Sequence, residues 1–404
     1  MNILVINCGS SSLKYQLLNI DTNEVKVLGM VDRIGMPNSK ITHCVANRKK
    51  MELTVDIPNH DVAVRLVLDS LICPDNGVIK NLNEIYAVGH RVVHAADKFS
   101  ESVLITNKVI KAIKDCSVFA PLHNPANLAG IEACSSYMPN VPQVAVFDTA
   151  FHQTMPPRSY IYALPYEVYE KYGIRRYGFH GTSHKYVSLR VAGILGKPIE
   201  KLKIITCHLG NGASIAAICH GKVVDTSMGL TPLEGLSMGT RCGDIDPEVV
   251  LFLMEKKNMT VQQMRNYLNK ESGVLGISGV SSDFRDIEKE AEKGNHRAQL
   301  ALDVFTHRVQ KYIGAYVAVM DGVDGIVFTA GIGENSPEIR RSICKNLSHL
   351  GISIDEEKNN TRGQELDIST AQASCRVVVI PTNEEWMIAI ETKKIVKAKE
   401  IQSA

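Results

Sequence analysis

The sequence has little that would point to a membrane, a nucleic acid or a disulfide-bonded secreted protein. Its 45 Lys and Arg residues nearly balance 43 Asp and Glu, and a formal net charge of +2 makes no electrostatic case for nucleic acid or an acidic lipid surface. No apolar run approaches the length that crosses a bilayer, and the run at residues 3–6 is far shorter than the core of a secretory signal. None of the ten cysteines belongs to a C-x-x-C pair, which is typical of reduced thiols. These absences predict a soluble, cytoplasmic protein that binds neither nucleic acid nor membrane.

The chain does have enough length for two domains, together with the pattern of an α/β fold. At 404 residues it exceeds what one hydrophobic core usually holds. Short alternating strands occupy the first 60 residues, and strands at residues 85–89 and 143–147 then alternate with helices. Further on, helical periodicity covers residues 247–257, 260–268 and 283–320. This order predicts layered α/β domains.

Two places in the chain share an arrangement in which a turn of small polar residues joins two apolar strands. These turns are "NCGSSS" at residues 7–12 and "HLGNGAS" at residues 208–214, and their repetition suggests a duplicated domain. A third glycine-rich turn is "TAGIGENS" at residues 329–336. One such turn is most often an ordinary hairpin, whereas three indicate backbone amides that cradle nucleotide phosphates. The chain has neither a P-loop nor a dinucleotide-binding fingerprint, so another kind of nucleotide site is expected.

Charged and amide side chains follow the apolar strands at their carboxyl ends or lie in the glycine-rich turns. They are Asn7, Arg91, Asp148, Asn211, Arg241 and Glu384. In open α/β sheets this edge is where ligands bind. Guanidinium groups suit carboxylates and phosphoryl oxygens, and a pair of carboxylates could hold a hydrated Mg²⁺. Each residue alone is more often part of a surface ion pair, so it is their shared position that predicts chemistry.

The histidines fall into two groups. Those beside the turns and strand ends are expected to form hydrogen bonds there: His90, His94, His123, His180, His184 and His208. Others look like surface residues: His43, His60, His296 and His349. The "FHGTSH" stretch has the spacing of a metal-binding pair, but no H-E-x-x-H motif or third ligand accompanies it, which favours hydrogen bonding over zinc.

At this point the residues match a known family. The chain resembles the acetate kinases, members of the actin, hexokinase and heat-shock-ATPase superfamily, over essentially its whole length. The matching stretches, in order, include "NCGSSSLKY", "GHRVVH", "PLHNPANL", "RRYGFHGTSH", "HLGNGASI", "GDIDP", "FTAGIGENS" and "PTNEE". The resemblance implies an α/β fold of two ribonuclease-H-like (actin-like ATPase) halves, with the active site in the cleft between two domains. We expect an N-terminal domain at residues 1–150 plus 385–404 and a nucleotide-binding domain at residues 151–384.

The resemblance also implies roles for individual positions. Arg91 would hold the substrate carboxylate, and the implied catalytic residues are Asp148, Arg91, His180 and Arg241. A small apolar pocket for the substrate methyl group is implied at Val93, Leu122, Phe179 and Pro232. Mg²⁺, for which Mn²⁺ can substitute, would bind at Asn7 and Glu384. Contacts with ATP or ADP are implied at Lys14, His208, Leu209, Gly210, Asn211, Gly212, Asp283, Phe284, Arg285, Gly331, Ile332, Gly333, Glu334 and Asn335.

The implied reaction is reversible, Mg²⁺-dependent transfer of a phosphoryl group from ATP to acetate in a homodimer, without a phosphoenzyme. Acetate is already ionised at neutral pH, so it needs relief from anion–anion repulsion more than it needs a base. Two alternatives stay open. One is a propionate or other short-chain carboxylate kinase on the same scaffold, although Val93 favours the two-carbon acid. The other is a non-catalytic nucleotide switch like actin.

The sequence departs from the family pattern beside both arginines. Residues 95–97 read Ala-Ala-Asp where the family usually has Gly-Gly-Glu, and Cys242 stands where serine is usual. Neither departure removes an implied site residue. They put the turnover rate and sensitivity to thiol reagents in question more than the reaction type.

Overall fold

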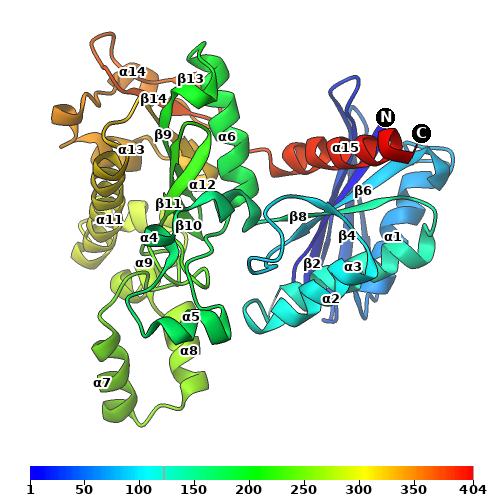
Figure 1. Cartoon of the computed structure of the whole chain (residues 1–404), viewed down its shortest axis with the longest axis horizontal. Helices are drawn as coiled ribbons and strands as arrows, with labels where there is room; N and C mark the ends of the chain where they lie inside the picture. Colours follow the sequence, from blue (N-terminus) through cyan, green and yellow to red (C-terminus); the bar gives the residue numbers. More distant parts are fainter. Residues whose placement is uncertain (122, 404) are drawn as a thin grey trace. The chain divides into compact units, whose positions relative to one another are not determined.

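The computed structural model describes residues 1–121 and 123–403, and the chain divides into two compact units (Figure 1). The first consists of residues 1–151 together with residues from 383 to the C-terminus, and the second of residues 152–382. Each unit is built around its own β-sheet. None of the helices in the described part of the chain combines the length and apolar character that a bilayer crossing needs.

The first unit has a sheet with the strand order β5-β4-β3-β2-β1-β6-β8-β7. Its strands are β1 (Asn2–Cys8), β2 (Ser12–Asn19), β3 (Glu24–Asp32), β4 (Lys40–Val45), β5 (Met51–Thr54), β6 (Ile85–Val92), β7 (Val103–Leu104) and β8 (Gln143–Phe147). Its α-helices are α1 (His60–Ile72), α2 (Asn107–Asp115), α3 (Asn124–Tyr137) and α15 (Glu384–Ser403).

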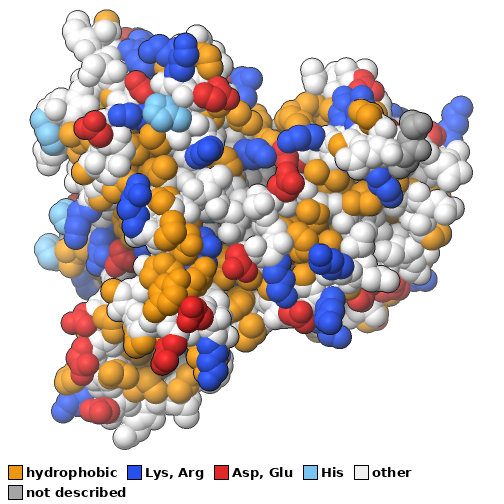
Figure 2. All heavy atoms as spheres, in the orientation of Figure 1, with side chains coloured by type: hydrophobic (Ala, Val, Ile, Leu, Met, Phe, Trp, Pro, Cys, Tyr) orange, Lys and Arg blue, Asp and Glu red, His pale blue; other side chains and the backbone are white. Residues whose placement is uncertain are grey.

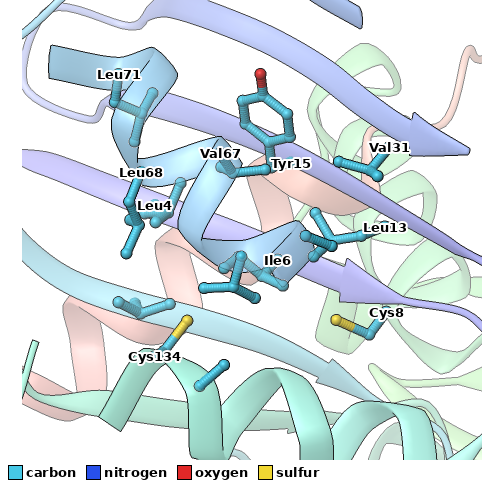
Figure 3. Close-up of a cluster of buried hydrophobic side chains, with 14 of the residues drawn as sticks. Leu4, Ile6, Cys8, Leu13, Tyr15, Val31, Val67, Leu68, Leu71 and Cys134 are labelled. Atoms are coloured by element: carbon cyan, nitrogen blue, oxygen red, sulfur yellow. The ribbon is translucent and has the colours of Figure 1, made fainter. Parts of the chain in front are cut away.

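Side chains of β1 alternate between two apolar cores, one on each face of this sheet. Leu4 and Ile6 pack with residues of α1 and α3, among them Leu68 (Figure 3). Ile3 and Val5 point to the other face and pack against α15. Because strand side chains alternate, a central strand needs apolar residues at consecutive positions, and each fully buried one contributes about 1.5–3 kcal/mol. The opening residues of the sequence therefore fix β1 in the middle of the sheet.

The second unit has a sheet with the strand order β11-β10-β9-β12-β14-β13. Its strands are β9 (Lys203–Leu209), β10 (Ala213–Cys219), β11 (Lys222–Thr226), β12 (Gly325–Thr329), β13 (Leu366–Asp367) and β14 (Arg376–Val379). Its α-helices are α4 (Pro157–Tyr160), α5 (Tyr166–Tyr172), α6 (Gly181–Ile194), α7 (Pro247–Lys257), α8 (Val261–Lys270), α9 (Gly273–Ser278), α10 (Phe284–Glu292), α11 (His296–Met320), α12 (Ala330–Asn335), α13 (Pro337–Cys344) and α14 (Glu356–Asn359).

The two sheets repeat one connection pattern. In the first unit β1, β2 and β3 are antiparallel neighbours, and β6 and β8 run parallel to β1. In the second, β9, β10 and β11 are antiparallel neighbours, and β12 and β14 run parallel to β9. The polar turns at residues 9–11 and 210–212 join the first two strands of the two patterns. This repetition confirms the predicted duplicated ribonuclease-H-like fold.

The sequence predicted helix over residues 283–320, and the structure divides this stretch in two. α10 ends at Glu292 and α11 begins at His296. Gly294 has a φ of 89°, a left-handed conformation that ends a helix. The Asn295 side chain then caps α11 by accepting a hydrogen bond from the amide of Arg297 at 3.1 Å. A Gly-Asn pair inside helical periodicity was the signal for this break.

Candidate active site

Three charged side chains of the first unit form one ionic cluster. Arg91 lies on β6, Asp148 directly follows β8, and Glu384 begins α15. The Arg91 guanidinium donates through Nε to Asp148 Oδ1 at 3.0 Å and through Nη2 to Asp148 Oδ2 at 2.7 Å. Its Nε also lies 4.0 Å from Oε2 of Glu384. Asp148 is only 2% exposed, so this two-pronged, charge-assisted contact holds Arg91 in one orientation.

Two carboxylates share one guanidinium in this cluster, which leaves negative charge in excess. Burial raises the pKa of Glu384 to about 7, with Arg91 opposing the rise and Asp148 and Glu385 adding to it. Burial lowers the pKa of Arg91, but the charges of Asp148 and Glu384 outweigh burial and hold that pKa above its usual value. A bound cation would favour the ionised form of Glu384 and relieve this excess.

The oxygen donors of the first unit suit Mg²⁺. Asn7 lies on β1, directly opposite Lys14 of β2. Across residues 1–121 and 123–403, no group of three or more His, Cys, Asp or Glu side chains is placed to hold a metal ion. A cation held by Glu384 and an Asn7 amide oxygen would therefore keep much of its water, as Mg²⁺ does. The residues present fit Mg²⁺ on the chemistry of these donors.

Two buried asparagines support this edge of the first unit, and sequence reasoning gave them no role. The Asn127 side chain accepts a hydrogen bond from the amide of Val93 at 3.1 Å and donates to the carbonyl of Cys8 at 2.8 Å. Asn124 accepts from the amide of His94 at 3.2 Å. Asn127 thereby ties the residue after β6 to the end of β1, and Asn124 holds the next residue, His94.

In the second unit, the turn between β9 and β10 has a histidine and an arginine beside it. A Cβ atom on Gly212 would lie 3.3 Å from Nη1 of Arg241 and 3.7 Å from Nε2 of His180, so both side chains approach this turn. The His180 ring stacks on His208, with ring centroids 4.2 Å apart. Arg241 donates to the carbonyl of Pro232 at 3.3 Å. Within the described residues no carboxylate forms an ion pair with Arg241. Burial lowers the pKa of Arg241, so a bound anion would favour its charged form.

His180 has an unusual backbone conformation. Its φ is 56°, in the left-handed region, where it caps the start of α6. A residue with a Cβ atom pays about 1–3 kcal/mol for such a conformation, and this kind of strain clusters at functional sites.

A cavity of about 490 Å³ in the second unit collects most of the residues predicted to contact nucleotide. The predicted residues that line it are Gly210, Asn211, Asp283, Phe284, Arg285, Gly331, Ile332 and Asn335. The residues that sequence reasoning missed are Ser282, Glu288, Ser336 and Arg362. Arg285 turns back to its own neighbour, donating through Nη2 to Asp283 Oδ2 at 2.5 Å. The cavity has the size of a small-molecule site.

Among the residues predicted to contact nucleotide, Leu209, Gly333 and Glu334 do not line this cavity, and each has contacts within the protein. Leu209 is fully buried, and the side chain of Glu334 accepts hydrogen bonds from the amides of Ala330 at 2.7 Å and Thr382 at 3.0 Å. The carbonyl of Gly333 accepts a hydrogen bond from the Arg340 guanidinium at 2.8 Å.

Of the four residues predicted to form the apolar pocket, Val93 is buried in the first unit. Phe179 is buried in the second unit, where its carbonyl lies 2.9 Å from Nε2 of His152. Pro232 is also in the second unit and contacts Arg241 through its carbonyl. Leu122 lies outside the described residues.

Sequence comparison and structure comparison with known proteins lead to the same family. The family model described as the acetokinase family matches residues 2–390. This chain belongs to the acetokinase family. It is 61% identical over 397 residues to the acetate kinase of Desulfitobacterium hafniense strain DCB-2, covering 98% of this chain and 100% of that protein. It is 60% identical to the acetate kinase of Alkaliphilus metalliredigens, again covering 98% of this chain and 100% of that protein.

Solved structures of family members superpose closely. The acetate kinase of Porphyromonas gingivalis matches with a TM-score of 0.94 at 50% identity, over 98% of this chain and 99% of that chain. A propionate kinase from Francisella tularensis matches with a TM-score of 0.91 at 45% identity, with the same coverage. A protein named an acetate kinase and one named a propionate kinase therefore both share the fold of this chain.

The Ala-Ala-Asp stretch at residues 95–97 contains an unusual backbone conformation. Ala96 has a φ of 52°, in the left-handed region where glycine has no steric penalty. A glycine at this position would adopt the same conformation without that penalty.

Of the histidines expected at the surface, His43 is buried and His60 is only partly exposed. His43 is 1% exposed, and its Nδ1 lies 2.7 Å from the hydroxyl of Tyr15. His60 is partly buried, and its Nε2 lies 2.7 Å from the carbonyl of Gly9 in the first polar turn. His43 lies in β4 and His60 begins α1. Their hydrogen-bond partners lie 28 and 51 positions away along the chain, and the sequence alone does not reveal partners at such distances.

Proposed function

We propose that this protein is an acetate kinase, which transfers the γ-phosphoryl group of ATP to acetate and forms acetyl phosphate and ADP reversibly. The observation that carries this proposal is the Arg91–Asp148 contact, in which a buried carboxylate holds one guanidinium in a single orientation. Membership of the acetokinase family and the names of the relatives at about 60% identity support the same reaction.

The chemistry requires charge neutralisation more than proton transfer. ATP⁴⁻ and acetate⁻ give ADP³⁻ and acetyl phosphate²⁻, so the charges balance with no proton gained or lost. The acetate oxygen forms a bond to the γ-phosphorus as the bond from that phosphorus to the ADP oxygen breaks. Arg91 holds the acetate carboxylate, while Arg241 and His180 stabilise charge on the transferring group. Asp148 orients Arg91 and takes no proton.

We further propose that Asn7 and Glu384 hold Mg²⁺, with Mn²⁺ as a possible replacement. When bound, the cation neutralises charge on the nucleotide phosphates. The excess negative charge beside Arg91 supports this assignment. Treatment with a chelator should abolish activity, and added Mg²⁺ should restore it. Glu384→Gln should raise the Mg²⁺ concentration needed for half-maximal rate, and an unchanged requirement would contradict the assignment.

Which carboxylic acid the protein phosphorylates needs a separate argument, because a propionate kinase has the same fold. Val93 is 7% exposed and supports a small pocket for a methyl group. One extra methylene is worth about 1–3 kcal/mol of discrimination, so propionate should be a poor but measurable substrate.

Trapping of acyl phosphates with hydroxylamine tests both statements. The protein is mixed with ATP, Mg²⁺ and hydroxylamine, and acetate, propionate or butyrate is added in parallel reactions. A strong signal with acetate, a weaker one with propionate and almost none with butyrate is the expected result. A reversed order would assign the protein to a longer acid. If no acid gives a signal, and the rate of ATP hydrolysis is the same with and without added acid, the result would indicate a nucleotide switch.

We propose that the protein works as a cytoplasmic homodimer. All ten cysteines are free thiols, which supports a reducing compartment. On α7 the apolar side chains of Val249, Leu251 and Phe252 are 44%, 55% and 54% exposed, and this supports burial by a second copy. Light scattering of the purified protein should give twice the mass of one chain, and a monomer would contradict the proposal.

A further inference from the structure

A buried chain of hydrogen bonds lies behind His180, and we propose that it keeps the proton of His180 on Nε2. The chain consists of Ser214, His184 and Thr206, and is called here the His180 relay. This inference rests on the proposed function, because it assigns positioning residues to the group that stabilises the transferring phosphoryl.

The relay is continuous and shielded from water. Nδ1 of His180 lies 2.8 Å from Oγ of Ser214, and the same oxygen lies 2.8 Å from Nε2 of His184. Nδ1 of His184 in turn lies 2.7 Å from Oγ1 of Thr206. Ser214 is on β10, His184 is on α6 and Thr206 is on β9, and all three are 0% exposed.

The direction of the hydrogen bonds follows from Thr206. In the described part of the chain, Nδ1 of His184 is the one hydrogen-bond partner of its hydroxyl. A buried hydroxyl that makes no donation costs about 1–3 kcal/mol, so the hydroxyl of Thr206 donates to this nitrogen. Nδ1 of His184 is therefore an acceptor.

Each later step is forced by the one before it. Burial, and then the nearby His152 and His208, hold the pKa of His184 well below its usual value, so its ring is neutral. A neutral ring that accepts at Nδ1 carries its proton on Nε2 and donates it to Ser214. The hydroxyl of Ser214 is then left to donate to Nδ1 of His180. A neutral His180 must consequently carry its proton on Nε2.

Nε2 and the neighbouring Cε1 form the edge of the His180 ring that approaches the turn between β9 and β10. Each would lie 3.7 Å from a Cβ atom on Gly212, and Nη1 of Arg241 would lie 3.3 Å from the same atom. The relay thus presents a hydrogen-bond donor beside a guanidinium. Because the proposed reaction moves no proton, His180 serves by keeping its N–H, and a lone pair at that place would repel phosphoryl oxygens.

Two substitutions at Thr206 test the relay. Thr206→Val keeps the shape but removes the hydrogen bond to Nδ1 of His184, so the proton of His184 can move to Nδ1 and reverse the two remaining hydrogen bonds of the relay. The expected result is a kcat reduced about tenfold or more, with KM for ATP and for acetate within about twofold, because the lost contact belongs to the transition state. Thr206→Ser keeps the hydroxyl and should restore most of kcat. Equal losses in both variants would overturn the inference.

A double-mutant cycle separates positioning from general destabilisation. Ser214→Ala should lower kcat about tenfold in the wild-type background and less than about twofold when His180→Ala is already present. Ser188→Ala is the matched control, since Ser188 is a fully buried hydroxyl of α6 that bonds the carbonyl of Lys185, and it should leave kcat unchanged. The same loss with and without His180 would overturn the relay. A wild-type protein that forms no acetyl phosphate would instead overturn the proposed function.

Discussion

Gly331→Ala is expected to stabilise the protein while weakening its use of ATP. Gly331 lies in the first turn of α12 and lines the cavity of about 490 Å³. A Cβ atom at this position would meet nothing within 4 Å, so the added methyl group has no protein atom to clash with. The methyl group would instead occupy space that we assign to the nucleotide.

The two effects have opposite signs and can be sized separately. Replacing a helical glycine by alanine gains about 0.5–1 kcal/mol, mainly because the unfolded chain loses freedom. In a unit of this size that corresponds to a Tm higher by about 1–4 °C. Forcing a methyl group against a bound nucleotide costs about 1–3 kcal/mol, which is about 5- to 150-fold in KM for ATP.

Gly314→Ala provides the matched control. Gly314 lies in α11, and a Cβ atom there would also meet nothing within 4 Å, but Gly314 does not line the cavity. Thermal melts and steady-state rates at saturating acetate should show a raised Tm in both variants and a raised KM for ATP only in Gly331→Ala. An unchanged KM in Gly331→Ala, with Tm raised, would refute the placement of the nucleotide in this cavity.

Three further predictions concern the first unit. Val93→Ala should increase kcat/KM for propionate relative to acetate by about tenfold, measured with the hydroxylamine assay, because removing two methyl groups enlarges the pocket. Ala96→Gly should raise stability by about 0.5 kcal/mol or more in urea denaturation, because it removes the left-handed penalty of an alanine. Burial lowers the pKa of His90 to about 4 from 6.5, so the unfolded chain takes up its proton first as pH falls. The stability that His90 supplies is present above pH 6.5, and about 3 kcal/mol of it is lost as pH falls towards 4. His90→Gln should flatten this loss, and an unchanged pH profile would contradict the assignment.

The sequence predicted the fold well because its main signals are local. The runs of apolar residues in β1 and β9, each followed by a small polar turn, indicated two matching strand–turn–strand units, and the two sheets repeat that order. The break at Gly294 and Asn295 was missed, since helical periodicity continues on both sides of it. A capping asparagine after a glycine decides the outcome there.

Site residues were predictable where they follow a strand, and their supporting contacts were not. Arg91 lies near the carboxyl end of β6 and Asp148 directly follows the neighbouring parallel strand β8, so their contact could be expected from their positions. The relay behind His180 joins residues from a helix and two strands, and no spacing in the sequence announces it. The contact between His60 and the carbonyl of Gly9 was equally unpredictable, because these two residues are 51 positions apart in the sequence. Such contacts are set by tertiary packing, which periodicity does not encode.

A single-turnover experiment tests the central claim most directly. Protein in excess is mixed with Mg²⁺ and ATP that carries a radioactive γ-phosphate, with or without acetate, and the reaction is quenched at short times. The account predicts that label passes from ATP to acetyl phosphate in one phase, with none bound to protein, and stays in ATP when acetate is omitted. Label that appears on the protein before acetyl phosphate, or that appears as inorganic phosphate regardless of acetate, would contradict it.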